Sequence, residues 1–110
     1  MSKVYTNLLL ERRGHTALVT LDNPPAHTWT LASLNGLTQL VADLNADPDV
    51  YALVITGGGA KFFSAGADLN VFADGNKDTA FGMAAAFGEA FEALSAFRGV
   101  SIAAINGYAI

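Results

Sequence analysis

The sequence predicts an α/β fold with parallel strand pairing, and the order of its apolar patterns is the reason. Two short apolar runs, residues 51–59 and 100–106, have the composition of buried strands, and each follows a stretch with helical spacing of apolar residues. An alternating pattern typical of a β-hairpin precedes both helical stretches. Because a helix that links two buried strands returns the chain to the same end of the sheet, these strands are expected to run parallel.

Residues 7–21 predict the hairpin. Two sets of alternate positions, Leu8, Leu10 and Arg12 and then Ala17, Val19 and Leu21, suit two strands, and Arg13-Gly14-His15 between them supplies a turn. The following Asp22-Asn23-Pro24-Pro25 ends regular structure, because proline fixes φ and lacks a backbone donor.

Two helices are predicted from periodicity and capping. The first begins after Thr30 as N-cap and ends at Asp47-Pro48. The second begins after Asn76 or Asp78 and ends at Arg98-Gly99, where a cation and a glycine suit a helix C-terminus. Their apolar stripes are Leu31, Leu34, Leu37, Val41 and Leu44 in the first, and Met83, Phe87, Ala90, Phe91, Leu94 and Phe97 in the second.

The two apolar runs predict strands buried on both faces, as in a covered parallel sheet. The run at 51–59, YALVITGGG, leads into three glycines, and we expect a loop from Gly57 to Asn70. The run at 100–106 is VSIAAIN, and the residues GYAI follow it. A strand without further neighbours would leave an exposed apolar edge, so we expect a longer natural protein that covers it.

Composition excludes several classes of protein. The 110 residues suit one small domain, and their net charge of −4 with scattered basic residues gives no footprint for nucleic acid. No cysteine is present, and neither a signal peptide nor a run long enough to span a bilayer is evident. We therefore expect a soluble, cytoplasmic protein without nucleic-acid or membrane partners. Hydrophobic residues at 52% against 15% charged residues indicate apolar surface that other subunits or further chain would cover.

Common catalytic motifs fail on their spacing. The run TGGGAKFFS lacks the Walker and dinucleotide patterns, and Lys61 is not followed by Ser or Thr. Ser64 lacks the preceding glycine of a nucleophile elbow. We expect His15 and His27 to be surface residues, although His27 could also contact a ligand, and no histidines and acids have metal-ligand spacing.

The stretch SAGAD at residues 64–68 leaves two interpretations open. Small side chains let a ligand approach the main chain, and amides at a helical turn starting near Asp68 could stabilise negative charge on a carbonyl oxygen. The alternative is an ordinary tight turn in which Asp68 caps a helix.

In their context these segments resemble a known family. The motif FFSAGADL after the strand YALVITGGG, the later SIAAINGYAI, and LDNPPAHTWTL after the hairpin are similar to the N-terminal part of the crotonase superfamily, the enoyl-CoA hydratase/isomerase family. The resemblance covers essentially residues 1–110, which would form part of a single acyl-CoA-binding domain. It implies a spiral of strand-strand-helix units.

The resemblance also implies site residues. Family members bind an acyl-CoA thioester whose oxygen is held by two backbone N–H groups, and Ala67 matches the first donor. The segments expected to contact coenzyme A are Ala65, Gly66, Asp68 and Leu69 beside the donor, and Ala26, His27 and Thr28 after the proline turn. Relatives often carry a lysine at the position of Asn70 and a basic residue near Pro25-Ala26, so contacts to the phosphates of coenzyme A are less firmly predicted than the thioester site.

The expected function is that of an enoyl-CoA hydratase, a lyase that adds water across the 2,3 double bond. In relatives a GGG run after the NGYA stretch supplies the second donor, and the catalytic glutamates lie farther on; we expect both beyond residue 110. Glu89 and Glu92 are expected on a solvated helix face. Alternatives are another family reaction (isomerase, decarboxylase, dehalogenase or CoA-ester hydrolase), or an inactive fragment or CoA-binding module. The resemblance implies no cofactor and no metal, and a homo-oligomer, either trimer or hexamer.

Overall fold

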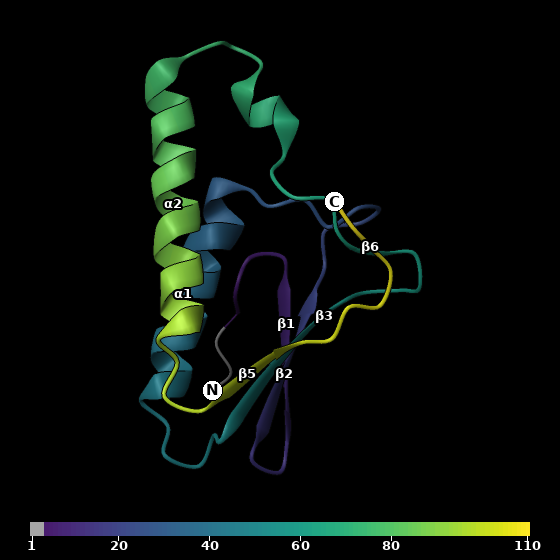
Figure 1. The fold of residues 1–110 in the computed structure, drawn as a ribbon, viewed down its shortest axis with the longest axis vertical. Coiled ribbons are helices and arrows are strands. Elements are labelled where there is room, and N and C mark those ends of the chain that lie inside the picture. Colours follow the sequence, from purple (N-terminus) through teal and green to yellow (C-terminus); the bar gives the residue numbers. More distant parts are fainter. Residues whose placement is uncertain (1–3) are drawn as a thin grey trace.

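The computed structural model describes residues 4–110 and contains two helices, one 3₁₀ helix and six strands within them. In chain order the elements are β1 (Leu8–Arg13), β2 (Thr16–Leu21), α1 (Leu31–Asn45), β3 (Ala52–Gly57), β4 (Phe62–Ser64), the 3₁₀ helix η1 (Leu69–Phe72), α2 (Lys77–Ser95), β5 (Val100–Ala103) and β6 (Tyr108–Ala109). The two long helices lie side by side along the sheet, as Figure 1 shows.

Four strands form the main sheet in the order β1-β2-β3-β5. The predicted hairpin is confirmed: β1 and β2 are antiparallel, and Gly14 in their turn has a φ of 61°, which glycine adopts at little cost. The predicted parallel pairing is also confirmed, because β3 runs parallel to β2 on one side and to β5 on the other. The chain thus has the expected α/β organisation.

The core lies between one face of this sheet and the helices. Alternate residues of β2 and β3 are buried, and α1 contributes Leu34, Leu37, Leu40, Val41 and Leu44. In α2, Met83, Ala86 and Ala90 are buried, while Phe91 of the predicted stripe is 43% exposed. The second helix ends earlier than predicted, at Ser95, although Phe97 beyond its end is still buried.

Burial on both faces was the wrong prediction for both apolar strands. In β3 the inward residues are buried and the outward ones, such as Val54, are half-buried. All four residues of β5 are exposed, with Ile102 at 50%, because β5 pairs only with β3 among the described residues. The expected apolar edge is therefore present.

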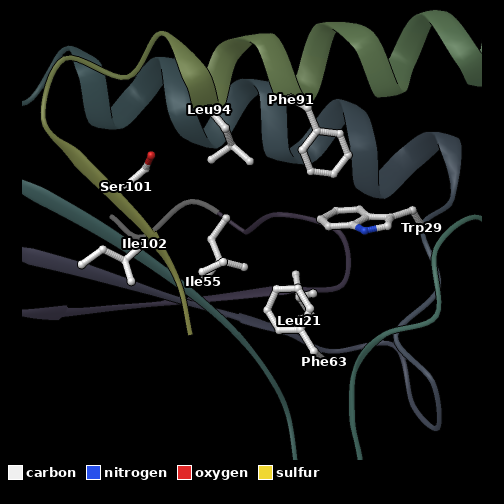
Figure 2. A pocket seen from close by; sticks show the side chains of 9 residues that line it. Leu21, Trp29, Ile55, Phe63, Phe91, Leu94, Ser101 and Ile102 are labelled. Carbon is white, nitrogen blue, oxygen red and sulfur yellow. The ribbon is translucent and has the colours of Figure 1, made fainter. Parts of the chain in front are cut away.

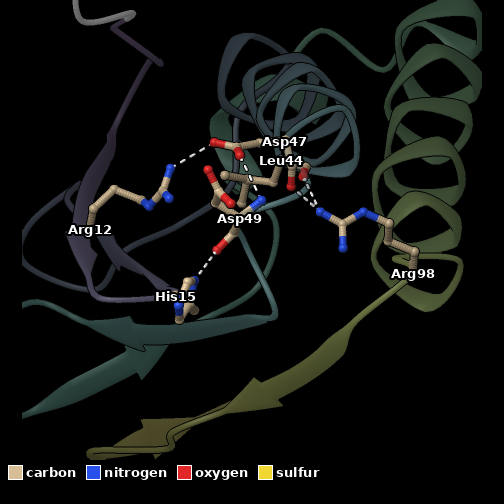
Figure 3. A network of polar contacts seen from close by, with 6 residues as sticks. All are labelled: Arg12, His15, Leu44, Asp47, Asp49 and Arg98. Carbon is tan, nitrogen blue, oxygen red and sulfur yellow. Dashed lines mark hydrogen bonds and ion pairs between the residues drawn. The ribbon is translucent and has the colours of Figure 1, made fainter.

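The ends of α1 are fixed by polar contacts. At the start, Thr30 and Ser33 form a reciprocal capping box, as the position of Thr30 predicted. At the other end, the guanidinium of Arg98 donates to the carbonyl oxygens of Leu44, Asn45 and Asp47. Figure 3 shows this cluster, in which Arg12 also pairs with the Asp47 carboxylate at 2.8 Å. The hydrogen bond from the Asp49 amide, followed by that from Arg12, lowers the pKa of Asp47.

A second, two-stranded sheet was not predicted. The Phe62-Phe63-Ser64 segment, expected in a loop, is β4 and pairs in parallel with β6. The Asn106 side chain joins this pair to the end of β3, because its Oδ1 accepts from Gly57 N–H at 2.9 Å and its Nδ2 donates to Gly59 O and Phe62 O. This small sheet positions the segment that follows it, residues 65–68.

Candidate active site at residues 64–68

Residues 64–68 lie beside the turn that follows the prolines. Ala65 N–H donates to Ala26 O at 2.9 Å. Farther along, Trp29 N–H donates to Gly66 O at 2.8 Å, and Asp68 N–H donates to Trp29 O at 2.9 Å. Two of the predicted site segments, 26–28 and 65–69, are therefore brought together although they are far apart in the sequence.

The amide of Ala67 differs from its neighbours. The amides of residues 65, 66 and 68 all donate hydrogen bonds, with Gly66 N–H bound to Ser64 Oγ at 3.2 Å. Within residues 4–110, the Ala67 N–H has no acceptor. Because Gly66 O and Asp68 N–H both face Trp29, the N–H between them points away from that partner. The fold leaves this donor for something other than its own main chain.

Gly66 makes the turn before this amide. Its φ of 85° lies in the left-handed region, where a side chain would be strained, and an added β-carbon would come within 3.2 Å of Ile110 O. The small residues of the stretch SAGAD thus serve a main-chain conformation. The requirement for glycine also follows from the close approach of the chain at Ile110.

The predicted helical turn after Asp68 is confirmed in a short form. Asp68 caps η1, and its Oδ1 accepts from Asn70 N–H at 3.0 Å. Ala67 precedes this cap, so its amide is not one of the orphan donors of the helix start. The capping interpretation is therefore confirmed for Asp68, and a donor outside the helix start lies next to it; that this donor stabilises negative charge on a ligand stays a prediction.

His27 is not the surface residue that the sequence suggested. Its side chain is 5% exposed, its Nδ1 accepts from Asn23 N–H at 3.0 Å, and its Nε2 is 2.8 Å from Gly58 O. Because Asn23 N–H must donate to Nδ1, the ring proton lies on Nε2 and is donated to Gly58 O. Both ring nitrogens of His27 therefore have hydrogen-bond partners within the protein.

An apolar cavity of about 340 Å³ adjoins the segment, between α2 and the sheet. Figure 2 shows Trp29 and Phe91 on one side of it and Phe63 with Leu21 on another. The rings of Trp29 and Phe91 meet edge to face with centroids 6.0 Å apart. The main chain of Trp29 pairs with Ala67, and its side chain lines the cavity. Trp29 therefore links the cavity to the segment that carries the free amide.

A second, more polar hollow of about 420 Å³ lies between the proline turn and the glycine run. Lys61 lines it together with Pro24 and Pro25. In the sequence Lys61 lies in the expected loop 57–70, far from the proline turn, where no basic residue is present. The lysine is visible in the sequence, but its place beside the proline turn depends on two loops that are distant in sequence and meet in the fold.

Other candidate groups stay apart from this region. Glu89 and Glu92 are exposed on α2, as expected. His15 is exposed at the hairpin turn, where its ring stacks on Tyr51 at 4.0 Å and its Nδ1 lies 2.8 Å from Asp49 O. Across residues 4–110 no three His, Asp or Glu side chains gather in a way that could hold a metal ion. Neither helix in that range is long and apolar enough to cross a membrane.

Known proteins share this sequence and fold. The chain is 63% identical to the solved structure of Pseudomonas aeruginosa DspI, with a TM-score of 0.95 over 99% of this chain and 45% of that one. It is 37% identical over 107 residues to the probable enoyl-CoA hydratase echA8 of Mycobacterium bovis, and 36% identical over 103 residues to the carnitinyl-CoA dehydratase of Salmonella enteritidis.

These alignments cover 96% and 94% of this chain, but the chain spans only about 40% of the length of these curated relatives. The family model for enoyl-CoA hydratase/isomerase matches residues 11–110. The strand-strand-helix organisation agrees with the solved relatives, so the fold is the N-terminal part of the crotonase fold. The chain belongs to the enoyl-CoA hydratase/isomerase family.

Proposed function

We propose that the full-length protein is an enoyl-CoA hydratase in which the N–H of Ala67 is one of two donors to the thioester oxygen. The observation that carries this proposal is the free amide of Ala67 in a segment whose neighbouring amides are all bonded. When water adds to C3 of an enoyl thioester, negative charge develops on the thioester oxygen. A donor already fixed in place stabilises that charge without reorganising.

Coenzyme A would lie along the two paired segments, against Ala65, Gly66, Asp68 and Leu69 on one side and Ala26, His27 and Thr28 on the other. Because the ring, the N–H and the carbonyl of His27 all have partners in the fold, its contact with the ligand would be by van der Waals packing. Lys61, on the adjoining hollow, offers a cation for a phosphate. The acyl chain would use the apolar wall formed by Trp29 and Phe63.

The remaining groups belong to other parts of the natural protein. In this proposal a second backbone donor and two glutamates, which act as acid and base on the water, come from outside residues 1–110. The chain needs no cofactor or metal for this chemistry, since coenzyme A is part of the substrate.

The direct test is hydration of crotonyl-CoA by the full-length protein, followed as loss of the ultraviolet absorbance of the conjugated thioester. Replacing the Ala67 amide by an ester removes the N–H and keeps the shape of the chain. This change should lower the rate by roughly 10²–10³-fold. The same replacement at exposed Ala32, in the first turn of α1, is the control and should leave the rate unchanged. An unaltered rate after replacement at Ala67 would contradict the assignment of the donor.

A second candidate is another reaction of the same family, favoured by the variety of names among the relatives, which include a carnitinyl-CoA dehydratase. Such a reaction would use the same oxyanion donor with a different arrangement of acids. Turnover of a different acyl-CoA without hydration of crotonyl-CoA would decide for it. Binding of coenzyme A without turnover of any thioester would indicate a binding module.

We also propose a homo-oligomer, trimer or hexamer, since β5 and Phe81 on α2 expose apolar side chains. Light scattering on the full-length protein measures the number of subunits. A monomer at micromolar concentration would contradict this part of the proposal.

A further inference from the structure

Ser64 is a buried polar residue three positions before the proposed donor, Ala67. It is 8% exposed, and its hydroxyl donates to His27 O at 2.8 Å while its Oγ accepts from Gly66 N–H at 3.2 Å. One hydroxyl therefore joins the proline turn to the peptide that precedes Ala67. A buried hydroxyl with both functions satisfied is costly to remove, because each former partner is left without a hydrogen bond.

The partner of Ser64 is itself held firmly. His27 has a φ of 52°, an uncommon conformation for a residue with a side chain, and its N–H donates to Asn23 O at 2.8 Å. Its ring bridges Asn23 and Gly58, so two other segments fix the position of the carbonyl that receives the Ser64 hydroxyl. The hydrogen bonds run from Gly58 through His27 and Ser64 to Gly66.

The consequence concerns the direction of the next amide. The main-chain bonds to Ala26 and Trp29 fix Ala65 N–H, Gly66 O and Asp68 N–H. The hydrogen bond from Gly66 N–H to Ser64 Oγ holds the peptide on the N-terminal side of Gly66. Gly66 has a φ of 85° and no β-carbon, so side-chain sterics do not restrict rotation of this peptide. Rotation of that peptide would shift Gly66 against Trp29, and the planar peptide that carries both Gly66 O and the Ala67 N–H would move with it.

We propose that Ser64 is a positioning residue for the Ala67 amide: its hydroxyl, held by the carbonyl of His27, orients the oxyanion donor without touching the substrate. This inference rests on the proposed function of that amide. It gives Ser64, which lacks the sequence context of a catalytic nucleophile, a structural role in the site. The ring of His27 contributes by holding the carbonyl and is a positioning group as well.

The test is Ser64→Ala in the full-length protein. Because a displacement of about 1 Å costs on the order of 10²-fold in rate, partial loosening of one peptide should lower kcat about tenfold, with KM within about twofold of the parent. Ser64→Thr keeps the hydroxyl and should restore most of kcat. Ser64→Cys, with a similar volume and a weak donor, should fall between the two and serves if the threonine variant does not fold.

A second readout separates positioning from simple loss of stability. A 3-ketoacyl-CoA bound in the site becomes more acidic when its thioester oxygen is stabilised as an enolate, and the enolate has its own ultraviolet band. Ser64→Ala should weaken this band at saturating ligand, while Asn45→Ala should not. Asn45 accepts a hydrogen bond from Arg98 N–H at 3.0 Å at the opposite end of α1, so its loss also removes a contact between distant segments but lies far from the site.

The outcomes distinguish the two proposals. If the parent protein stabilises the enolate but does not hydrate crotonyl-CoA, the hydratase assignment fails and the role of Ser64 can still be measured by the enolate band. If Ser64→Ala has the parent kcat and the parent enolate band, the positioning role is overturned. Equal losses in Ser64→Ala and Asn45→Ala would likewise overturn it, because they would indicate a general effect of stability.

Discussion

The two sheets of this chain are held together in different ways. The main sheet with α1 is packed through side chains, since Leu34, Leu37 and Leu40 are wholly buried beneath it. The small β4–β6 sheet and residues 64–68 are held by main-chain hydrogen bonds, by the Asn106 side chain and by glycines that permit close approach. The scaffold therefore depends on the volume of its side chains, whereas the candidate site depends on main-chain contacts, on small residues and on a few polar side chains.

The largest expected effect is Leu37→Ala in the main core. Leu37 has no exposed surface, so its truncation removes buried apolar contacts and leaves a cavity. The free energy of unfolding should fall by about 2–5 kcal/mol, measured by urea denaturation. A loss below about 1 kcal/mol would mean that Leu37 is packed less tightly than its complete burial indicates.

Gly57→Ala tests the second region. An added β-carbon would lie under 3.0 Å from the main chain of Phe62 and Phe63, which cannot move away as a flexible side chain could. Unfolding free energy should fall by about 1–3 kcal/mol, and the β4–β6 pairing should loosen. Gly88→Ala in α2 is the matched control, because among residues 4–110 no atom beyond its chain neighbours and the adjoining helix backbone lies within 4 Å of its added carbon.

In the control, the same substitution should stabilise the protein by roughly 0.5–1 kcal/mol, since alanine favours the helix. Opposite signs for the two glycines are the expected result. Equal effects would show that close packing of the main chain at Gly57 does not decide the conformation of the site region.

Thr30→Ala lies at the boundary of the two regions. Thr30 caps α1 directly after Trp29, whose main chain pairs with Ala67. Loss of the cap should cost about 1 kcal/mol. Thermal unfolding checks the stability, and a kcat near that of the parent is expected because the Trp29 hydrogen bonds remain. A loss of kcat without a loss of stability would show that the two regions are coupled more closely.

The smallest effect is expected at Asp47, on the surface of the scaffold. Its pKa is lowered in the folded state, so the stabilisation from its carboxylate is present above the ordinary value of 3.8 and is lost as the pH falls through the folded pKa. Asp47→Asn should therefore flatten the acid side of the stability curve slightly. The difference between the urea midpoints at neutral and at acid pH measures this effect. The same difference in Asp47→Asn and in the parent would contradict the assignment.

The side-chain region was predictable and the main-chain region was not. Alternation over 17–21, the helical spacing from Leu34 to Leu44 and the cap at Thr30 each gave the correct element, because burial imposes a period on the sequence. The pairing of β4 with β6 left no such period, since it depends on hydrogen bonds between segments separated by more than forty residues. Burial of His27 and the contact of Ser64 likewise depend on segments distant in sequence, since His27 meets Gly58 and Ser64 meets His27.

Ala67 is an instructive intermediate case. The sequence indicated it through resemblance to a family, and its role stays a prediction. What the sequence could not provide is the set of bonds to Ala26 and Trp29 that leave its amide free. Burial on both faces of β5 was predicted wrongly because apolar composition does not reveal which neighbouring elements cover a strand.

The contact of Arg98 with the end of α1 has a consequence for how the protein opens. The carbonyl groups in the last turn of α1 accept hydrogen bonds from the Arg98 guanidinium only when the segment after α2 lies beside them. Fraying of α1 at that end and detachment of the segment after α2 are therefore one cooperative event, and hydrogen exchange should report both with the same free energy of opening. Arg98, more than fifty residues from Leu44 in the sequence, thus contributes to the free energy of opening at the C-terminal end of α1.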